Sequence, residues 1–385
     1  MAVYTKINRN DVSLISKKFK LKDKIKFYGI KQGIENTNYL LKILKKKYIL
    51  TIFEKRVQKK DLPFFMKLMD KLYYNKIKCP KPLKTKNSKY LINIKKKQAC
   101  IVTFVDGKDK KILNAKNCYE AGKNIAKLHL VSKKIKLFRN NSMSIKKLRP
   151  LLNSIKFKSK IISPNIKFFL NSNFNNINKK WPKNIPAGII HGDLFIDNIF
   201  FKNNKFSGFI AFYFSSNDFF MYEIAICVNA LCFDKKNRKF YLNKNKVKNF
   251  INGYKSVRKI SIKEKNSLNI LCKGAAMRYL LTRIYDYFNT PKNAYIKIKD
   301  PKEYFQKLVI HNKIIYAAGY CGSGTVWARW MGKKAGEIVL NLESESAFFN
   351  IPFKRMPFYN GNPWFLPIAI EYYRVQDWWL NSRKG

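Results

Sequence analysis

The fold of this chain is decided by the stretch His191-Gly192-Asp193-Leu194-Phe195-Ile196-Asp197-Asn198-Ile199-Phe200-Phe201. Apolar residues that favour strands lie on both sides, at 188–190 and 199–201, so a loop between two short β-strands is predicted. Within the loop, an aspartate is followed five residues later by an asparagine. This spacing suits phosphoryl transfer, because Asp193 can accept the proton of an attacking hydroxyl and Asn198 can bind Mg²⁺ on the phosphates.

The same offset occurs in the protein-kinase catalytic loop, H-R-D-x-x-x-x-N. Here Gly192 replaces the arginine, and the form H-G-D-x-x-x-x-N resembles the loop of aminoglycoside phosphotransferases and related small-molecule kinases. The structural alternative is a solvated turn in which Asp193, Asp197 and Asn198 only cap backbone groups. The strands predicted on both sides favour the catalytic interpretation.

The composition indicates a folded protein with ample length for a core, since 46% of its 385 residues are hydrophobic. No uncharged run reaches the roughly 18 residues of a membrane-spanning helix. The start, Met-Ala-Val-Tyr-Thr-Lys, lacks the apolar segment of a signal peptide. A cytoplasmic protein without a membrane partner is therefore expected, with its seven cysteines buried as reduced thiols.

A formal net charge of +56 would usually indicate nucleic-acid binding. Lysine outnumbers arginine 67 to 12, however, and asparagine, isoleucine, phenylalanine and tyrosine are also abundant, as expected from an AT-rich coding sequence. The lysines are spread along the chain instead of forming one stripe. No specific nucleic-acid partner is expected, and a polyanion-binding protein is kept only as a minor alternative.

The N-terminal third has the pattern of a nucleotide-covering lobe. Strands are predicted at 25–30 and 39–43, with a polar, glycine-bearing turn between them. Kinase-like folds cover nucleotide phosphates with the backbone amides of such a turn, although ordinary hairpins share the pattern. The candidate ATP-binding residues here are Gly29, Gly33 and Asn36.

A third strand is predicted at 48–53, the strand that carries the phosphate-binding lysine in the wider kinase fold. Thr51 occupies that position, followed by Lys55 and Arg56, so the sequence leaves open which cation holds the phosphates. Two more strands, at 90–94 and 100–104, lead into the turn Val105-Asp106-Gly107. This is the expected hinge between two lobes, where the backbone of Thr103 and Val105 would contact adenine.

The remainder of the first 312 residues is mostly helical. A strand is predicted at 206–214 and an interior histidine at His129. The predicted helices are 115–131, 219–233, 244–254, 262–289 and 301–311. Strands first and helices later indicate a two-lobe α+β architecture.

Several stretches together resemble one family closely. They are M-A-V-Y-T (1–5), G-I-E-N-T-N-Y (33–39), Y-I-L-T-I-F-E-K-R (48–56), D-L-P-F-F (61–65), H-G-D-L-F (191–195), N-D (217–218), A-I-C (225–227) and L-T-R-I-Y-D (281–286). Residues 1–312 thus resemble the homoserine kinases of the aminoglycoside phosphotransferase-like superfamily, which have a two-lobe protein-kinase-like fold. The resemblance implies ATP and Mg²⁺ as cofactors and the hydroxyl of L-homoserine, an intermediate of threonine biosynthesis, as the substrate.

The resemblance also implies roles for individual residues. Asp193 would be the catalytic base and Asn198 a Mg²⁺ ligand, while the 29–38 turn covers the phosphates. On a late helix, Arg283 and Asp286 would contact the carboxylate and ammonium of the substrate. A structural ion pair is the equally weighted alternative for these two.

One position departs from the family pattern. The family's strand after the loop is Gly-x-Ile-Asp-Phe-Tyr-Phe, and its aspartate is the second metal ligand. Here the residue is Ala211, which has no oxygen to offer, so a rate loss of roughly 10²–10³-fold or more is expected. Glu223 stands where the family has an aspartate of structural character. The chain is therefore an impaired kinase, or a pseudokinase that binds a nucleotide or partner, unless the alanine is a sequence error.

The composition changes near residue 313, and five of the six tryptophans follow it. The motifs G-Y-C-G-S-G (319–324), R-M-P-F-Y (355–359) and G-N-P-W-F-L-P (361–367) resemble the C-terminal end of FAD-dependent amino-acid or amine oxidoreductases. Those enzymes hold FAD on an N-terminal G-x-G-x-x-G unit, which this chain lacks. The expected organisation is a nucleotide-covering lobe at 1–104, a helical lobe at 105–312, and an appended fragment at 313–385 that is either a fusion or an assembly artefact. The oligomeric state is not indicated.

Overall fold

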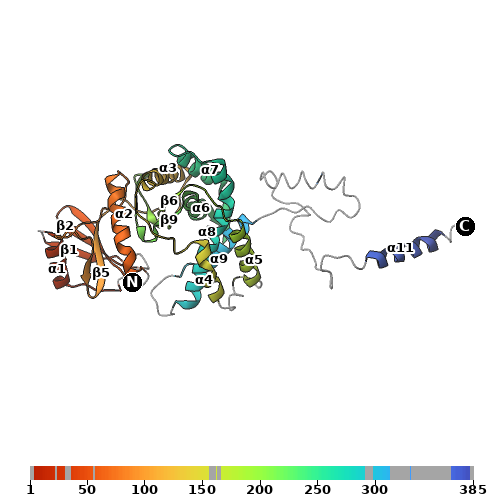
Figure 1. The fold of residues 1–385 in the computed structure, drawn as a ribbon, viewed down its shortest axis with the longest axis horizontal. Coiled ribbons are helices and arrows are strands. Elements are labelled where there is room, and N and C mark those ends of the chain that lie inside the picture. The colour runs from red at the N-terminus through yellow and green to blue at the C-terminus, as the bar shows by residue number, and fades with distance from the viewer. Residues whose placement is uncertain are drawn as a thin grey trace. The chain divides into compact units, whose positions relative to one another are not determined.

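The computed structural model describes residues 4–21, 24–30, 36–54, 57–155, 162, 166–290, 298–312, 330 and 366–381. The chain divides into two compact units, Met1–Lys313 and Ile314–Gly385. Figure 1 shows that the first unit begins with a sheet, drawn in red and orange, and continues as an assembly of helices.

The sheet has five antiparallel strands in the order β1-β2-β3-β5-β4. They are β1 (Ile25–Gly29), β2 (Thr37–Ile43), β3 (Lys46–Ile52), β4 (Ile92–Ile94) and β5 (Lys97–Thr103). In β2, alternate side chains are buried, as expected for a strand with one face on a core. That core is completed by α1 (Arg9–Phe19), which begins at an Asn8 capping box and buries Val12, Ile15 and Phe19.

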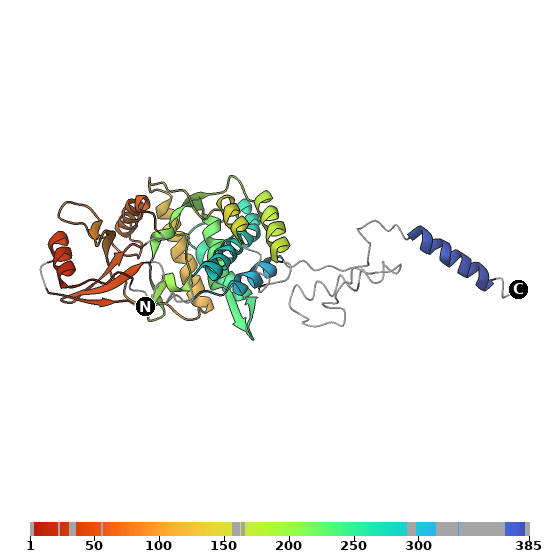
Figure 2. The ribbon, with the colours of Figure 1, turned by 90° about the horizontal axis from the view of Figure 1, so that it is seen from below.

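Helix α2 (Leu62–Tyr74) lies between the sheet and the later helices in both views (Figures 1 and 2). Pro63 stands in its first turn, where the fixed φ of proline favours the start of a helix. Its buried residues belong to the same hydrophobic cluster as Cys100 of β5 and Ile190 beside the catalytic loop. This cluster therefore extends across both lobes, and the sheet and α1 enclose a second, separate cluster.

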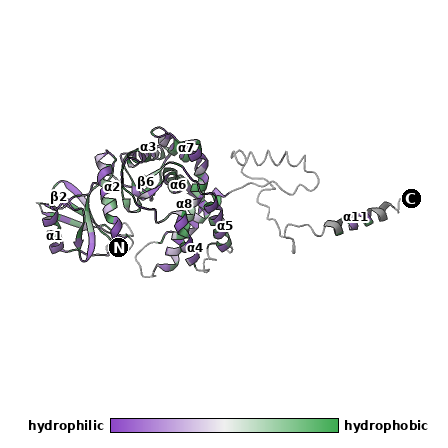
Figure 3. Cartoon of the chain, viewed as in Figure 1, coloured by the Kyte–Doolittle hydropathy of each residue, from purple (hydrophilic) through white to green (hydrophobic). Residues whose placement is uncertain are grey.

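The helical lobe contains α3 (Ala115–Ser132), α4 (Arg149–Ser154), α5 (Ile166–Lys179), α6 (Phe220–Leu231), α7 (Lys244–Lys255), α8 (Ile262–Asn289) and α9 (Pro301–His311). Three short antiparallel strand pairs accompany them: β6 (Ala187–Ile190) with β9 (Ser216–Phe219), β7 (Ile199–Lys202) with β8 (Lys205–Phe209), and β10 (Phe233–Lys236) with β11 (Lys239–Leu242). Outer helices such as α7 carry both hydrophilic and hydrophobic residues (Figure 3).

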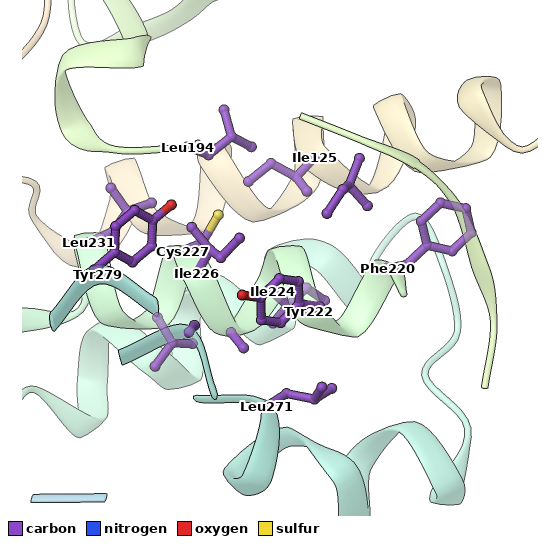
Figure 4. Close-up of a cluster of buried hydrophobic side chains, with 14 of the residues drawn as sticks. Ile125, Leu194, Phe220, Tyr222, Ile224, Ile226, Cys227, Leu231, Leu271 and Tyr279 are labelled. Carbon is purple, nitrogen blue, oxygen red and sulfur yellow. The ribbon is translucent and has the colours of Figure 1, made fainter. Parts of the chain in front are cut away.

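Helix α6 is buried almost all round, which makes it the centre of this lobe. Figure 4 shows Ile226 and Cys227 of α6 in one cluster with Leu194 of the catalytic loop and Tyr279 of α8. The loop is therefore fastened to the core by Leu194, which has no exposed surface.

Most predicted elements are confirmed within a few residues, including all five strands of the sheet and the five later helices. The strand predicted at 206–214 is wrong beyond Phe209. Ala211 adopts a left-handed conformation, with φ 62° and ψ 54°, and residues 212–214 form a 3₁₀ turn. The run of aromatic and β-branched residues suits a strand, but the backbone of Ile210 is bound to the catalytic loop and turns the chain there.

Six of the seven cysteines lie in the described residues, and all six are buried free thiols as predicted. Among the described residues, no helix is both long enough and apolar enough to cross a membrane. In the second unit the structure describes α11 (Leu366–Asn381), with an Arg374–Glu371 ion pair. The oxidoreductase-like motifs and the helix expected at 325–340 lie outside the described residues, except for Trp330 and the last two residues of the third motif.

Candidate active site

The loop predicted to be catalytic connects β6 to β7 and contains a 3₁₀ turn at Ile196–Asn198. Gly192 has φ 79°, and a Cβ there would lie 2.7 Å from the carbonyl oxygen of Phe214. This position therefore requires glycine, which explains why the arginine of the protein-kinase motif is absent.

Asp193 and Asn198 are brought into direct contact. The Asn198 side-chain amide donates to the Asp193 carbonyl oxygen at 2.7 Å and to carboxylate Oδ2 at 3.2 Å. The Tyr279 hydroxyl donates to the other carboxylate oxygen, Oδ1, at 3.2 Å. The carboxylate is thus held from both sides, and the Asn198 amide is oriented so that its own oxygen points away from Asp193.

Burial raises the pKa of Asp193, and the nearby Arg278 guanidinium partly offsets this effect. Arg278 is almost completely buried and donates to the carbonyl oxygen of Gly192 at 2.9 Å. It therefore supplies positive charge beside the carboxylate and also fixes the loop backbone. Neither Arg278 nor Tyr279 belongs to a motif identified in the sequence, so no local pattern marked them as site residues.

Glu223 on α6 binds the backbone of the catalytic loop. Its carboxylate accepts hydrogen bonds from the backbone amides of His191 at 2.8 Å and Gly192 at 2.7 Å. Burial alone would raise the pKa of Glu223, but hydrogen bonds from the His129 side chain and the His191 backbone amide lower it overall. The structural role expected for Glu223 is confirmed, and its target is the loop itself.

His129 is the interior histidine predicted from the sequence. It is fully buried, with Nε2 3.2 Å from Glu223 Oε2 and Nδ1 2.8 Å from the Tyr254 hydroxyl. Burial lowers the pKa of His129, so the ring is neutral, with Nε2 donating to Glu223 and Nδ1 accepting from Tyr254. It supports the loop through Glu223 and does not reach Asp193.

Ala211 follows directly after a residue bound to this loop. The Ile210 amide donates to the Asn198 carbonyl at 3.1 Å, and His191 Nε2 lies 2.7 Å from the Ile210 carbonyl. A left-handed conformation costs an alanine about 1–2 kcal/mol, whereas Asp and Asn adopt it more readily. Position 211 thus keeps a backbone suited to a short polar side chain while presenting only a methyl group.

The donor set for a divalent cation is therefore incomplete. Asn198 offers an amide oxygen, and Ala211 offers none. Mg²⁺ in phosphoryl-transfer sites is usually held by one or two carboxylates together with phosphate oxygens and water. The described residues fit such an ion at Asn198 but lack the carboxylate that position 211 would supply.

The candidate nucleotide-binding residues lie at one edge of the sheet and at its link to the helices. Gly29 ends β1 opposite Tyr39, while Gly33 is outside the described residues. The Asn36 side chain accepts the Glu54 amide at 3.2 Å, so it ties the turn to the end of β3. At the expected hinge, Thr103 is bonded to Lys81.

Val105 at the hinge differs from Thr103 in its hydrogen bonding. Neither of its backbone polar groups has a hydrogen-bond partner among the described residues. Such free groups could contact adenine.

Thr51 occupies the position where the wider kinase fold has its phosphate-binding lysine. Its side chain is buried, and its hydroxyl donates to Asn38 at 2.8 Å. Lys55 and Arg56 lie outside the described residues.

Arg283 and Asp286 lie on α8, but Arg283 is engaged elsewhere. Its guanidinium donates to Glu303 at 2.7 Å and to the Asp300 carbonyl at 3.0 Å, and it stacks on the Tyr304 ring at 4.5 Å. The backbone carbonyl of Asp286 accepts the Thr290 amide. Their role as substrate contacts stays a prediction.

Comparisons with known proteins identify the family of this chain. Residues 26–245 match the model of the phosphotransferase enzyme family. The chain is 37% identical to a homoserine kinase of Bradyrhizobium diazoefficiens, over 83% of this chain and 97% of that protein. It is 38% identical to a homoserine kinase of Allorhizobium ampelinum, over 83% of this chain and 99% of that protein.

Solved structures share the fold at lower identity. An amicoumacin kinase bound to AMP-PNP and Ca²⁺ superposes with a TM-score of 0.60 at 13% identity, covering 80% of this chain and 92% of that one. A choline kinase from Cryptosporidium parvum gives 0.54 at 15% identity, covering 87% and 98%. The predicted two-lobe, protein-kinase-like α+β fold is therefore confirmed.

Proposed function

The chain belongs to the phosphotransferase enzyme family and is homologous to homoserine kinases, and we propose that it transfers the γ-phosphoryl group of ATP to the side-chain hydroxyl of L-homoserine. This reaction would place it in threonine biosynthesis. The similarity supports the substrate because it extends over nearly the whole length of the homoserine kinases it matches.

The arrangement around Asp193 is the observation that carries the proposal. Its carboxylate is held by Tyr279 and Asn198, and burial raises its pKa. A positioned carboxylate with a raised pKa is a better proton acceptor for a substrate hydroxyl than a fully solvated one. Asp193 would orient the hydroxyl and take its proton as the phosphoryl group is transferred.

The same proposal includes a reduced rate. When bound, Mg²⁺ neutralises charge on the phosphates, and the Asn198 amide oxygen would hold it. Because position 211 contributes no carboxylate, we expect turnover to be roughly 10²–10³-fold below that of a chain with aspartate there. An inactive protein that binds a nucleotide or a partner is the second candidate function, and Ala211 is the observation that favours it.

Homoserine-dependent release of ADP tests the proposal. We expect the purified chain to release ADP only when homoserine is present, and Asp193→Asn to abolish this release because the amide cannot accept the proton. Asp109→Asn, at an exposed loop position, is the control and should behave as wild type. Equal ADP release with and without homoserine, or an unchanged rate in Asp193→Asn, would refute the assignment.

A further inference from the structure

We propose that Asp197 and Lys299 form a binding site for the zwitterionic head of an amino-acid substrate. Lys299 would bind the α-carboxylate and Asp197 the α-ammonium group. This inference rests on the proposed function, and it names the residues that would select an amino acid over other small alcohols.

The two side chains form an ion pair that stays open to solvent. Lys299 Nζ lies 3.7 Å from Asp197 Oδ2, and the side chains are 47% and 54% exposed. An exposed pair of this kind contributes about 0–1 kcal/mol to stability. A substrate that offers both an anionic and a cationic group can therefore replace the pairing at little cost.

The pair is connected to the catalytic carboxylate through one aromatic contact chain. Lys299 Nζ lies 5.0 Å from the centre of the Phe195 ring, and Phe195 meets Tyr279 edge to face at 4.8 Å. The Tyr279 hydroxyl in turn donates to Asp193. Both charges also reach Asp193 electrostatically, since Asp197 raises its pKa and Lys299 lowers it.

The chemistry of the acceptor matches this arrangement. In homoserine only two methylene groups separate the reacting hydroxyl oxygen from the α-carbon, so the charged head must lie close to the catalytic base. Asp197 is four residues after Asp193 in the same loop, and Lys299 directly precedes Asp300, the N-cap of α9. A cation and an anion near Asp193 are complementary to the two charges of a zwitterion.

Arg283, which the sequence suggested as a contact for the substrate's carboxylate, is less available to bind a ligand. It is largely buried, and it is already bonded to Glu303 and to the Asp300 carbonyl. Removing one partner of such a buried pair would leave the other charge uncompensated. The structure therefore suits Arg283 for holding residue 300, and with it Lys299, at the start of α9.

A buried hydroxyl on a ring that contacts Phe195 and Tyr279 also indicates a polar occupant. Tyr304 has no exposed surface, and its hydroxyl has no hydrogen-bond partner among the described residues. Its ring packs on Tyr279 at 5.2 Å and on Phe195 at 6.3 Å. Because an unpartnered buried hydroxyl is costly, a bound polar group or water in this region would be stabilising.

The test compares three ligands in the presence of a non-hydrolysable ATP analogue, with calorimetric binding as the readout. The ligands are homoserine, 3-aminopropan-1-ol, which lacks the carboxylate, and 4-hydroxybutanoate, which lacks the ammonium group. Lys299→Met should weaken homoserine and 4-hydroxybutanoate by about 10–100-fold and leave 3-aminopropan-1-ol unchanged. Asp197→Asn should weaken homoserine and 3-aminopropan-1-ol and leave 4-hydroxybutanoate unchanged.

Lys302→Met removes the same charge from an exposed position three residues away and should leave all three affinities unchanged. Unchanged affinity for the ATP analogue shows that each variant is folded. If Lys299→Met weakens homoserine and 3-aminopropan-1-ol by the same factor, or weakens neither, the assignment of Lys299 is wrong. If the wild-type chain binds 3-aminopropan-1-ol but not homoserine, the proposed substrate fails as well.

Discussion

At the scale of single residues, the active loop depends on one buried carboxylate. Glu223 accepts two successive backbone amides of the loop and is itself held by the neutral ring of His129. These bonds set the direction in which Asp193 leaves the backbone. Glu223 is a positioning residue, because it acts on the loop and does not touch Asp193 itself.

Glu223→Gln should lower the free energy of unfolding by about 1–3 kcal/mol. Glutamine has a single acceptor oxygen, so its NH₂ group would face a backbone amide that is left without a partner. Denaturant unfolding measures the loss, with Glu120→Gln on α3 as the control.

The loss should also depend on pH. The pKa of Glu223 is lowered in the folded chain, so its contribution is present at neutral pH and disappears as the pH falls through that lowered value. The stability difference between wild type and Glu223→Gln should therefore shrink in acid. A difference that grows as the pH falls would contradict the role assigned to Glu223.

At the scale of elements, α3 and α7 approach each other so closely that glycine is needed on both. A Cβ at Gly122 would lie 2.1 Å from the Phe250 carbonyl oxygen, and one at Gly253 would lie 2.0 Å from that of Tyr119. The pair of helices supports His129 and Tyr254, which lie beneath the loop. Close packing at the periphery thus helps to position the site.

Gly253→Ala should destabilise the chain by about 1–3 kcal/mol, because the helices must separate to admit the methyl group. At an unconstrained helix position, the same change would instead stabilise by up to about 1 kcal/mol. Asn252→Ala, at the neighbouring exposed position of α7, provides the control and should be neutral or stabilising. Thermal unfolding of the two variants decides the matter, and equal melting temperatures would show that the helices are not locked by this contact.

At the scale of the whole molecule, all three histidines of the chain are held neutral by burial. Burial lowers the pKa of His129, His191 and His311, the last to about 4. Below pH 6.5 the unfolded chain therefore binds protons that the folded chain does not. As a result, the free energy of unfolding decreases as the pH is lowered from about 6.5 to about 4.

The contribution of His311 to this pH dependence can be measured separately. Its contribution to the pH dependence should amount to up to about 2 kcal/mol between pH 7 and pH 5. In His311→Gln the unfolding free energy should fall less steeply over that range, as measured by urea unfolding at each pH. Parallel pH profiles for the two proteins would show that His311 is accessible to protons in the folded state.

The sequence predicted those parts of the site that depend on local spacing. Asp193 and Asn198 belong to one short loop, and the strands around it follow from runs of apolar residues. Glu223 and Tyr279 come from about 30 and 86 residues further along the chain, so only the packing of α6 and α8 brings them to the loop. No local pattern marks such residues.

Two elements also differ between the prediction and the structure because non-local contacts or turn geometry determine them. The residues around Ala211 have strand propensity, but contacts with the loop impose a turn there. The hairpin of β10 and β11 was not predicted, although Asn237 and Arg238 form its turn with positive φ angles. In both cases tertiary contacts or turn geometry override the propensity of the residues.

The most direct test of the central claim is the homoserine-dependent ADP release of wild type, Ala211→Asp and Ala211→Gly, measured side by side. Glycine removes the left-handed strain without adding a ligand, so it separates the backbone effect from the missing carboxylate. We predict a low but homoserine-dependent rate for wild type and Ala211→Gly, and a gain of about 10²–10³-fold for Ala211→Asp. A wild-type rate equal to that of Ala211→Asp would contradict the account, because the chain would then need no carboxylate at position 211.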